Sequence, residues 1–338
     1  MESKYILLTF DYELFLGSRS GSVKDCLLDP TEQIRILLNK YALKAIFFVD
    51  TTYMWRLKNE SINSINCKKN YELIEEQLYR LKSDGHFIYH HLHPHWMYAI
   101  YLNEIDQWDL SETSHYSFSQ LHPDEKASLM HFSSIFIQQF EGNQATGFRA
   151  GGLYIDPIQD FIPYFKKHSI HYDFSVVPND YSFGDHLSYD FRGLPHQPYT
   201  FEQSIQFATE KGEFMEFPIT RFTLSGVPKL LNGVYHRLFV SPNEEMAGKP
   251  AKLASLQKPV NTALKMNLPL SIEFLNAFNK YCCMYVLKKE RYIQFLSHPK
   301  LINDKHLKAL DYMVGKLNNE FDLVSDFHAI KAEFSTNL

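Results

Sequence analysis

Histidines are concentrated in one short stretch of the chain, residues 86–95, which reads HFIYHHLHPH. With 16 His in 338 residues, composition alone predicts about half a histidine in a stretch of this length. Histidine-rich tracts of this kind are typical of metal binding. Zinc suits neutral imidazole together with one carboxylate and keeps a coordination position open for water. The alternative interpretation is a strand end that carries stacked or hydrogen-bonded histidines.

The spacing within this stretch indicates which imidazoles could share an ion. Residues 87–92 (FIYHHL) predict a buried strand, and Pro94 prevents the strand from continuing. His91 and His95 are four residues apart, so their rings can converge on one cation where the backbone turns after the strand. We expect His86 and His90 on the opposite face of the strand, because side chains alternate along it.

A second group of residues that could bind a metal or transfer a proton lies near the amino terminus. The apolar run YILLTF, residues 5–10, is typical of a strand buried on both faces of a parallel sheet, and Asp11, Tyr12 and Glu13 follow it directly. Of two acids placed where a buried strand meets its loop, one can bind a metal and the other can accept a proton from water. Acids at a solvated loop start are the ordinary alternative.

Three further fragments carry polar groups at or near the ends of apolar runs. Arg149 in FRAGG precedes two glycines, which permit close approach of the backbone to a ligand. Asp173 lies inside the apolar stretch YDFSV, where an unpaired carboxylate is costly to bury. His298 follows the strand-like run YIQFL in the sequence LSH.

The order of these fragments resembles the polysaccharide deacetylases, the NodB-homology or carbohydrate esterase family 4 group. The fragments in question are TFDYE (9–13), HLHPH (91–95), FRAGG (148–152), DFS (173–175) and LSH (296–298), and KAIFFV (44–49) is similar to the family's second strand. The resemblance extends from about Tyr5 to about Phe327. The form HLHPHW resembles a branch associated with bacterial surface-polysaccharide or O-antigen synthesis.

The resemblance implies one divalent metal ion, with zinc as the first choice and nickel, cobalt or iron as alternatives. Where the family has a second aspartate, this chain has Tyr12, so we assign the ligand role to Glu13 and the role of base to Asp11. Glu13, His91 and His95 are then the expected metal ligands. The third motif departs from the family too, because Ala150 and Gly151 stand where prolines usually follow the arginine.

The resemblance also implies how the remaining residues act. Arg149 pairs with Asp11 and keeps that carboxylate ionised, while His298 protonates the leaving amine as general acid. Asp173 is the expected partner of His298. The residues expected to contact substrate are Tyr12, His93, Trp96, Gly151 and Gly152, of which His93 could instead contact the metal.

Strand-like and helix-like segments alternate along the chain and must position these residues. The strands are expected at residues 5–10, 44–49, 87–92, 146–149, 172–176, 214–219 and 292–296. Helical patterns at 30–41 and 71–85 fill two of the gaps, which implies a parallel sheet. We predict a single-domain α/β protein, an irregular (β/α)7 barrel over 1–338, with the catalytic groups at the carboxyl ends of the strands. Long inserts are expected near 96–119 and 225–287, the first as a wall of the substrate groove or a satellite hydrophobic cluster.

The composition of the chain limits the classes of molecule that the protein is expected to bind. A net charge of −5 argues against nonspecific binding to nucleic acid or to acidic membranes. We expect no membrane span. The four cysteines form neither a disulfide framework nor a zinc pattern, so we expect a cytoplasmic enzyme with reduced thiols. Such an enzyme meets nucleotide-linked or lipid-linked amino sugars, from which it removes an N-acetyl or N-formyl group. Alternatives are hydrolysis of a non-sugar amide and an inactive glycan-binding or assembly subunit.

Overall fold

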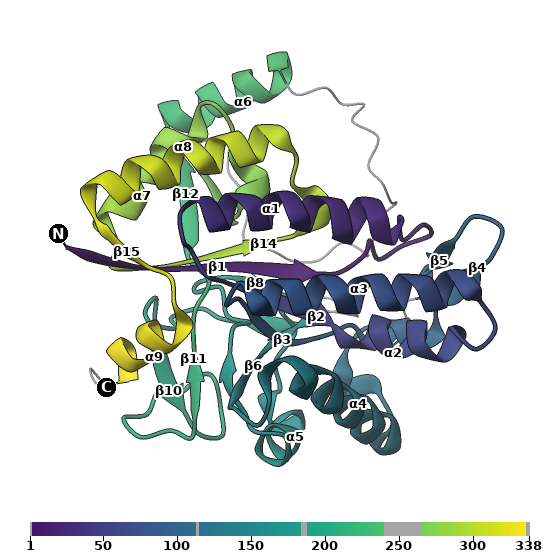
Figure 1. Cartoon of the computed structure of the whole chain (residues 1–338). Helices are drawn as coiled ribbons and strands as arrows, with labels where there is room; N and C mark the ends of the chain where they lie inside the picture. The colour runs from purple at the N-terminus through teal and green to yellow at the C-terminus, as the bar shows by residue number, and fades with distance from the viewer. Residues whose placement is uncertain (1, 113–114, 184–187, 240–264, 336–338) are drawn as a thin grey trace.

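A curled parallel sheet forms the centre of the computed structural model, which describes residues 2–112, 115–183, 188–239 and 265–335 (Figure 1). Seven parallel strands are hydrogen bonded in the order β11-β7-β6-β3-β2-β1-β14. They are β1 (Ser3–Tyr12), β2 (Ala45–Asp50), β3 (Phe87–Leu92), β6 (Thr146–Ala150), β7 (Ile170–Asp173), β11 (Phe214–Glu216) and β14 (Tyr292–Ser297). These are the seven strands that the sequence predicts, and the prediction of an irregular α/β barrel is confirmed.

The two ends of this row of strands are joined through the segment that follows β11. The backbone N–H of Ile219 donates to the carbonyl oxygen of Val176, with 2.8 Å between the atoms, and that of Thr220 donates to the carbonyl oxygen of Gln294, at 3.1 Å. The segment therefore contacts β14 and the residues that follow β7. Two shorter strands extend the sheet, β10 (Tyr199–Phe201) antiparallel to β11 and β15 (Asp322–Val324) parallel to β1.

Helices connect the strands, and most of them cover the outer face of the sheet, whereas α9 (Phe327–Ser335) contributes to the barrel interior. They are α1 (Asp29–Lys40), α2 (Thr51–Glu60), α3 (Ile65–Ser83), α4 (Pro123–Glu141), α5 (Ile162–Lys167), α6 (Val227–Phe239), α7 (Asn279–Lys289), α8 (Asp304–Glu320) and α9 (Phe327–Ser335). Asp50, the last residue of β2, caps α2 by accepting from the backbone N–H groups of Thr52 and Tyr53. Ser64 caps α3 in the same way.

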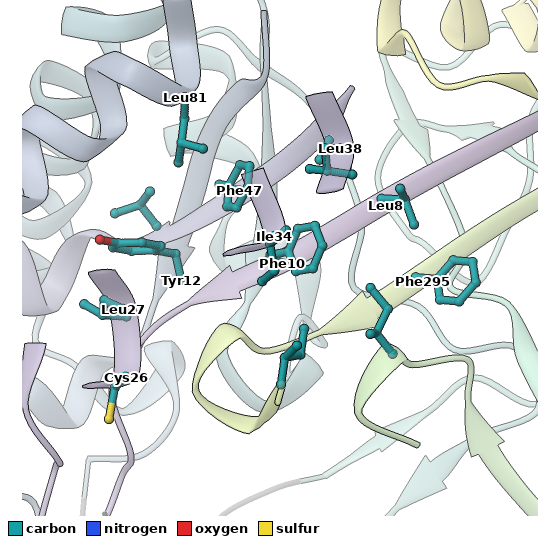
Figure 2. Close-up of a cluster of buried hydrophobic side chains, with 14 of the residues drawn as sticks. Leu8, Phe10, Tyr12, Cys26, Leu27, Ile34, Leu38, Phe47, Leu81 and Phe295 are labelled. Carbon is teal, nitrogen blue, oxygen red and sulfur yellow. The ribbon is translucent and has the colours of Figure 1, made fainter. Parts of the chain in front are cut away.

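Alternation along the strands creates two separate cores. Side chains of one face fill the barrel interior, where α9 contributes Phe327; this group includes Tyr5, Leu7, Phe48, Phe87 and Tyr89. Side chains of the other face pack against the helices, as Figure 2 shows for Leu8, Phe10 and Tyr12 of β1 and for Ile34 and Leu38 of α1. On β1, odd-numbered residues therefore face the interior and even-numbered residues face the helices.

The first insert is a small hairpin, β4 (Ile100–Leu102) and β5 (Gln107–Asp109), preceded by a 3₁₀ turn, Pro94–Tyr98. Trp96 is fully buried, with its ring centroid 4.6 Å from that of Tyr53 and 5.7 Å from that of Trp108. The expectation that Trp96 contacts substrate is therefore corrected: a large apolar ring next to this hairpin is more stable inside a hydrophobic cluster.

The second insert supplies a strand pair, β12 (Arg221–Ser225) and β13 (Lys265–Pro269), together with α6 and α7. Residues 240–264 of this insert lie outside the described residues. Within this insert a 3₁₀ turn, Ile272–Phe274, is followed by α7. The backbone N–H of Ile272 donates to the Ser297 hydroxyl, at 2.9 Å, which places this turn beside the end of β14.

Candidate metal centre

The carboxylates of Asp11 and Glu13 continue the interior face of β1, whereas Tyr12 between them faces the helices. Tyr12 is 2% exposed, and its hydroxyl donates to Oε1 of Gln77 on α3 at 2.9 Å. The expectation that Tyr12 contacts substrate is corrected by this position, because a one-residue step along a strand reverses the direction of the side chain. Asp11 and Glu13, two residues apart, share the interior face.

Strand β3 brings two imidazoles to Glu13. Oε2 of Glu13 lies 3.2 Å from Nε2 of His91 and 2.5 Å from Nε2 of His93, and the two imidazole nitrogens are 3.0 Å apart. One ligand atom from each of the three residues lies within 4.8 Å of the others, and all three side chains are buried. Like Asp11 and Glu13, His91 and His93 are two residues apart and share one face of their strand.

The hydrogen bonds of His91 suit it to metal binding. Its Nδ1 lies 2.8 Å from the carbonyl oxygen of Arg149, which can only accept, so we assign the proton of the neutral ring to Nδ1. The lone pair of Nε2 is then directed at Glu13 and His93. A backbone carbonyl that orients a histidine in this way is a common outer contact of metal-binding imidazoles. The donor set of two imidazoles and one carboxylate therefore fits a zinc-like ion.

His95, expected as a metal ligand, lies beside this cluster but is not one of the three. Its ring centroid is 5.3 Å from that of His93, and its ring stacks parallel to that of Tyr116. In the described part of the chain neither ring nitrogen of His95 has a hydrogen-bond partner, and burial lowers the pKa of His95 to about 3. His95 lies in the 3₁₀ turn that begins at Pro94, whereas His91 lies in β3 itself. The ligand role of His95 therefore stays a prediction. The structure favours His93 as the second imidazole ligand.

Asp11 is held by Arg149, which reaches it from β6. Nη1 of Arg149 lies 2.7 Å from Oδ1 of Asp11, Nη2 donates to the hydroxyl of Thr9 at 2.8 Å, and Nε donates to the carbonyl oxygen of Phe174 at 3.0 Å. Burial alone raises the pKa of Asp11, but the charges of Arg149, His91 and His298 together outweigh burial, and the net effect lowers the pKa. Asp11 is therefore ionised and fixed in orientation.

His298 lies at the open side of the cluster, with its side chain 23% exposed. Its Nε2 is 3.7 Å from Oδ2 of Asp11 and 3.7 Å from Oε1 of Glu13. Its Nδ1 lies 2.9 Å from Oε1 of Glu273, in the 3₁₀ turn of the second insert. Burial lowers the pKa of His298, but the hydrogen bond and charge of Glu273, together with the charges of Asp11 and Glu13, outweigh this effect and the net pKa is raised.

Asp173, the expected partner of His298, has other contacts. Its carboxylate accepts from the hydroxyl of Ser175 at 2.9 Å and from the Ser175 backbone N–H at 3.1 Å. Burial and the nearby charge of Asp173 raise the pKa of Glu216 well above its usual value, so Glu216 is a protonated neighbour of Asp173. The expected pairing is corrected: Glu273 occupies the place beside His298, and Asp173 belongs to the support of the Arg149 loop, since Ser175 also accepts from the Ala150 backbone N–H at 3.0 Å.

The two glycines after Arg149 allow the loop to pass close to the cluster. A Cβ atom on Gly151 would lie 2.4 Å from the carbonyl oxygen of Leu92 and 2.6 Å from Nδ1 of His93. Gly152 has a φ of +61°, and a Cβ there would lie 2.7 Å from the Tyr116 hydroxyl. Gly151 therefore gives the His93 ring its room. Contact of either glycine with substrate remains a prediction.

The other histidines of the stretch lie outside the cluster. His90 faces the helices, with Nδ1 2.8 Å from the Ser133 hydroxyl and Nε2 3.0 Å from that of Thr146, and burial lowers its pKa to about 3. Nδ1 of His86 accepts from the backbone N–H of Ala45 at 3.2 Å. Both are structural residues.

Two residues at the site, Glu273 and Lys300, are missing from the sequence predictions. Glu273 comes from the long insert, and the sequence does not show where that insert folds back. Lys300 follows His298 by two residues and donates to Oε1 of Glu13 at 2.8 Å. Because Lys300 lies so close to the LSH fragment in the sequence, its position near the site could have been predicted.

Comparison with known proteins supports the fold. No family model and no curated protein matches the chain. The structure is similar to that of a candidate polysaccharide deacetylase from Mycobacterium smegmatis, with a TM-score of 0.50 and 12% identity over 99% of this chain and 91% of that one. Lower TM-scores relate it to Puue allantoinase (0.48; 9% identity; 94% and 86% covered) and to a candidate polysaccharide deacetylase from Pseudomonas aeruginosa PAO1 (0.45; 11% identity; 95% and 86% covered). At these identities the likeness is one of fold, so any function must be argued from the site.

The described helices include no apolar segment of the length that crossing a bilayer requires.

Proposed function

We propose that this protein is a divalent-metal-dependent hydrolase that removes an N-acetyl or N-formyl group from an amino sugar in the synthesis of a bacterial surface polysaccharide. The observation that carries the proposal is the buried group of Glu13, His91 and His93 beside the Arg149–Asp11 pair. Structural ion pairs occur in many proteins, but two imidazoles that share a carboxylate at the strand ends of an α/β barrel are typical of a metal-dependent active site.

The donor set defines the role of the ion. When bound by Glu13, His91 and His93, a zinc-like ion polarises the amide carbonyl and lowers the pKa of a water molecule. Asp11 is the base that accepts the proton of this water as its oxygen bonds to the carbonyl carbon. Arg149 keeps Asp11 ionised and aligned for this step, since it contacts the carboxylate through one end of its guanidinium and Thr9 through the other.

Cleavage of the carbon–nitrogen bond requires a proton for the leaving amine. His298 is the general acid, because it is the most exposed of the titratable groups around Asp11 and its protonated form is stabilised. Glu273 holds Nδ1–H of His298, so that the proton on Nε2 is the one transferred. The products are a free amino sugar and acetate or formate.

The substrate class and compartment belong to the same proposal. The cysteines at 26, 67, 282 and 283 are free thiols, which supports a reducing compartment such as the cytoplasm. An enzyme there acts on nucleotide-linked or lipid-linked precursors.

Acetate release tests the proposal. We would load the purified protein with zinc, nickel, cobalt or iron and incubate it with a panel of free and nucleotide-linked acetamido sugars, with simple non-sugar amides in parallel. We expect acetate from at least one sugar, and a loss of about 10²–10⁴ in rate for Asp11→Asn and for His298→Asn. Release from the non-sugar amides alone would identify a different amidohydrolase. A chain that binds metal but cleaves none of the panel would contradict the proposal.

A further inference from the structure

Lys300 is a buried lysine whose ammonium group is held entirely by the chain that follows β1. Its Nζ lies 2.8 Å from Oε1 of Glu13, 2.7 Å from the carbonyl oxygen of Leu14 and 5.1 Å from the ring centroid of Phe15. The side chain is 7% exposed. It projects from the 3₁₀ turn Pro299–Leu301, directly after His298, and so connects the end of β14 to the end of β1.

The two carboxylate oxygens of Glu13 have different surroundings. Oε2 is the oxygen that faces the imidazoles, 2.5 Å from His93 and 3.2 Å from His91. Oε1 is the oxygen that faces Lys300. A carboxylate can bind a metal through one oxygen or through both, and a donor that occupies one of them favours binding through the other.

We propose that Lys300 is a positioning residue that restricts Glu13 to binding the metal through Oε2 alone. This inference rests on the proposed metal centre. With Oε1 held by the ammonium group, Glu13 contributes one ligand atom instead of two. The ion then keeps a low coordination number, with positions left for water and for the substrate carbonyl.

The Lys300 charge has a second effect on the same ion. Its ammonium group offsets the charge of Glu13, so the ligand set donates less negative charge than two imidazoles and a free carboxylate would. A less neutralised ion is a stronger Lewis acid. The positioning role and this electrostatic effect both act through Glu13, without contact between Lys300 and the reacting atoms.

An alternative is that Lys300 only stabilises the fold, as a buried ion pair between two strand ends. Removing it then lowers stability, because a buried carboxylate is left without its cation. The positioning role adds a change in metal coordination that a purely structural role does not produce. The test must therefore measure the coordination number.

Cobalt(II) provides that measurement, because its visible absorption depends strongly on coordination geometry. The full chain would be loaded with cobalt as wild type, Lys300→Met, Lys300→Arg and Lys308→Met, the last being the same change at an exposed lysine of α8. We expect Lys300→Met to lose about half or more of the molar absorption of its cobalt bands, as Glu13 gains its second bond to the ion and coordination rises. Lys300→Arg keeps a cationic donor and should retain the wild-type spectrum, as should Lys308→Met.

The spectra distinguish a positioning role of Lys300 from a purely structural role. Bands of equal intensity in wild type and Lys300→Met, with one cobalt per chain in both, would overturn the positioning role while leaving the metal centre intact. A wild-type chain that takes up no cobalt would refute the proposed metal centre and this inference with it. If Lys300→Met does not fold, Lys300→Leu, which also lacks a donor for Oε1, serves in its place: an unchanged spectrum there overturns the proposal, and a loss of absorption supports it.

Discussion

The guanidinium of Arg149 on β6 and the carboxylate of Asp11 on β1 form an ion pair with 2.7 Å between Nη1 and Oδ1, at a site where Arg149 has no exposed surface. Two strands, β2 and β3, separate β1 from β6 in the sheet. The pair therefore forms only when the sheet curls, and it links the fold directly to the proposed base.

Removal of Arg149 should destabilise the protein strongly. Arg149→Met leaves Asp11 buried without its partner, and we expect a loss of about 3–5 kcal/mol in the free energy of unfolding. The double variant Arg149→Met/Asp11→Asn lacks the unpaired charge and should be more stable than Arg149→Met alone. Urea unfolding followed by circular dichroism measures both. Losses that simply add in the double variant would show that the two side chains do not interact.

The identity of the second imidazole ligand can be tested with matched aromatic variants. His93→Phe and His95→Phe each keep a ring of similar size, so the packing against Tyr116 is preserved in the second. We expect His93→Phe to weaken zinc affinity by more than about 100-fold and His95→Phe by less than about 10-fold, since loss of a ligand costs more than loss of a neighbour. Zinc competition with a chelator gives the affinities. The opposite ranking would assign the ligand role to His95.

The space beside His93 is too small for an added methyl group at position 151, so Gly151→Ala should change both stability and zinc binding. In Gly151→Ala the added Cβ meets the Leu92 carbonyl oxygen and the His93 ring at distances no side chain normally accepts. We expect a loss of about 1–3 kcal/mol in unfolding free energy, together with weaker zinc binding. Gly233→Ala is the control, because nothing lies within 4 Å of its added Cβ; it should leave zinc binding unchanged. Equal zinc affinity in both variants would separate Gly151 from the metal centre.

His86 should make stability depend on pH. Burial lowers the pKa of His86 to about 4 from 6.5, so the folded state favours the neutral ring. The unfolded chain binds more protons between these values, and the stabilising contribution is complete above pH 6.5 and lost as the pH falls to 4. The loss is about 3 kcal/mol for this group. His86→Asn retains an acceptor for the Ala45 N–H but does not titrate, so the difference in unfolding free energy from wild type should change across this window. A constant difference from pH 4 to 7 would contradict the prediction.

The strands were predictable because each is a run of apolar residues, and β3 was expected with its observed bounds, Phe87–Leu92. The Arg149–Asp11 contact also follows from motif order. The family resemblance does not predict the position of Tyr12, because the alternation of side chains along β1 directs Tyr12 toward the helices.

The loops account for the remaining differences. Whether His93 or His95 joins Glu13 depends on where β3 ends and a 3₁₀ turn begins, and spacing alone permits both. Glu273 reaches His298 from 25 positions earlier in the chain, through an insert whose path depends on tertiary packing. Such contacts need the folded backbone.

The most direct test of the metal centre is a crystal structure of the zinc-loaded protein with anomalous diffraction data collected on both sides of the zinc edge. We predict one strong anomalous peak per chain, within about 2.0–2.2 Å of Glu13 Oε2 and of the Nε2 atoms of His91 and His93. A zinc-loaded crystal with no peak between these three side chains would contradict the account.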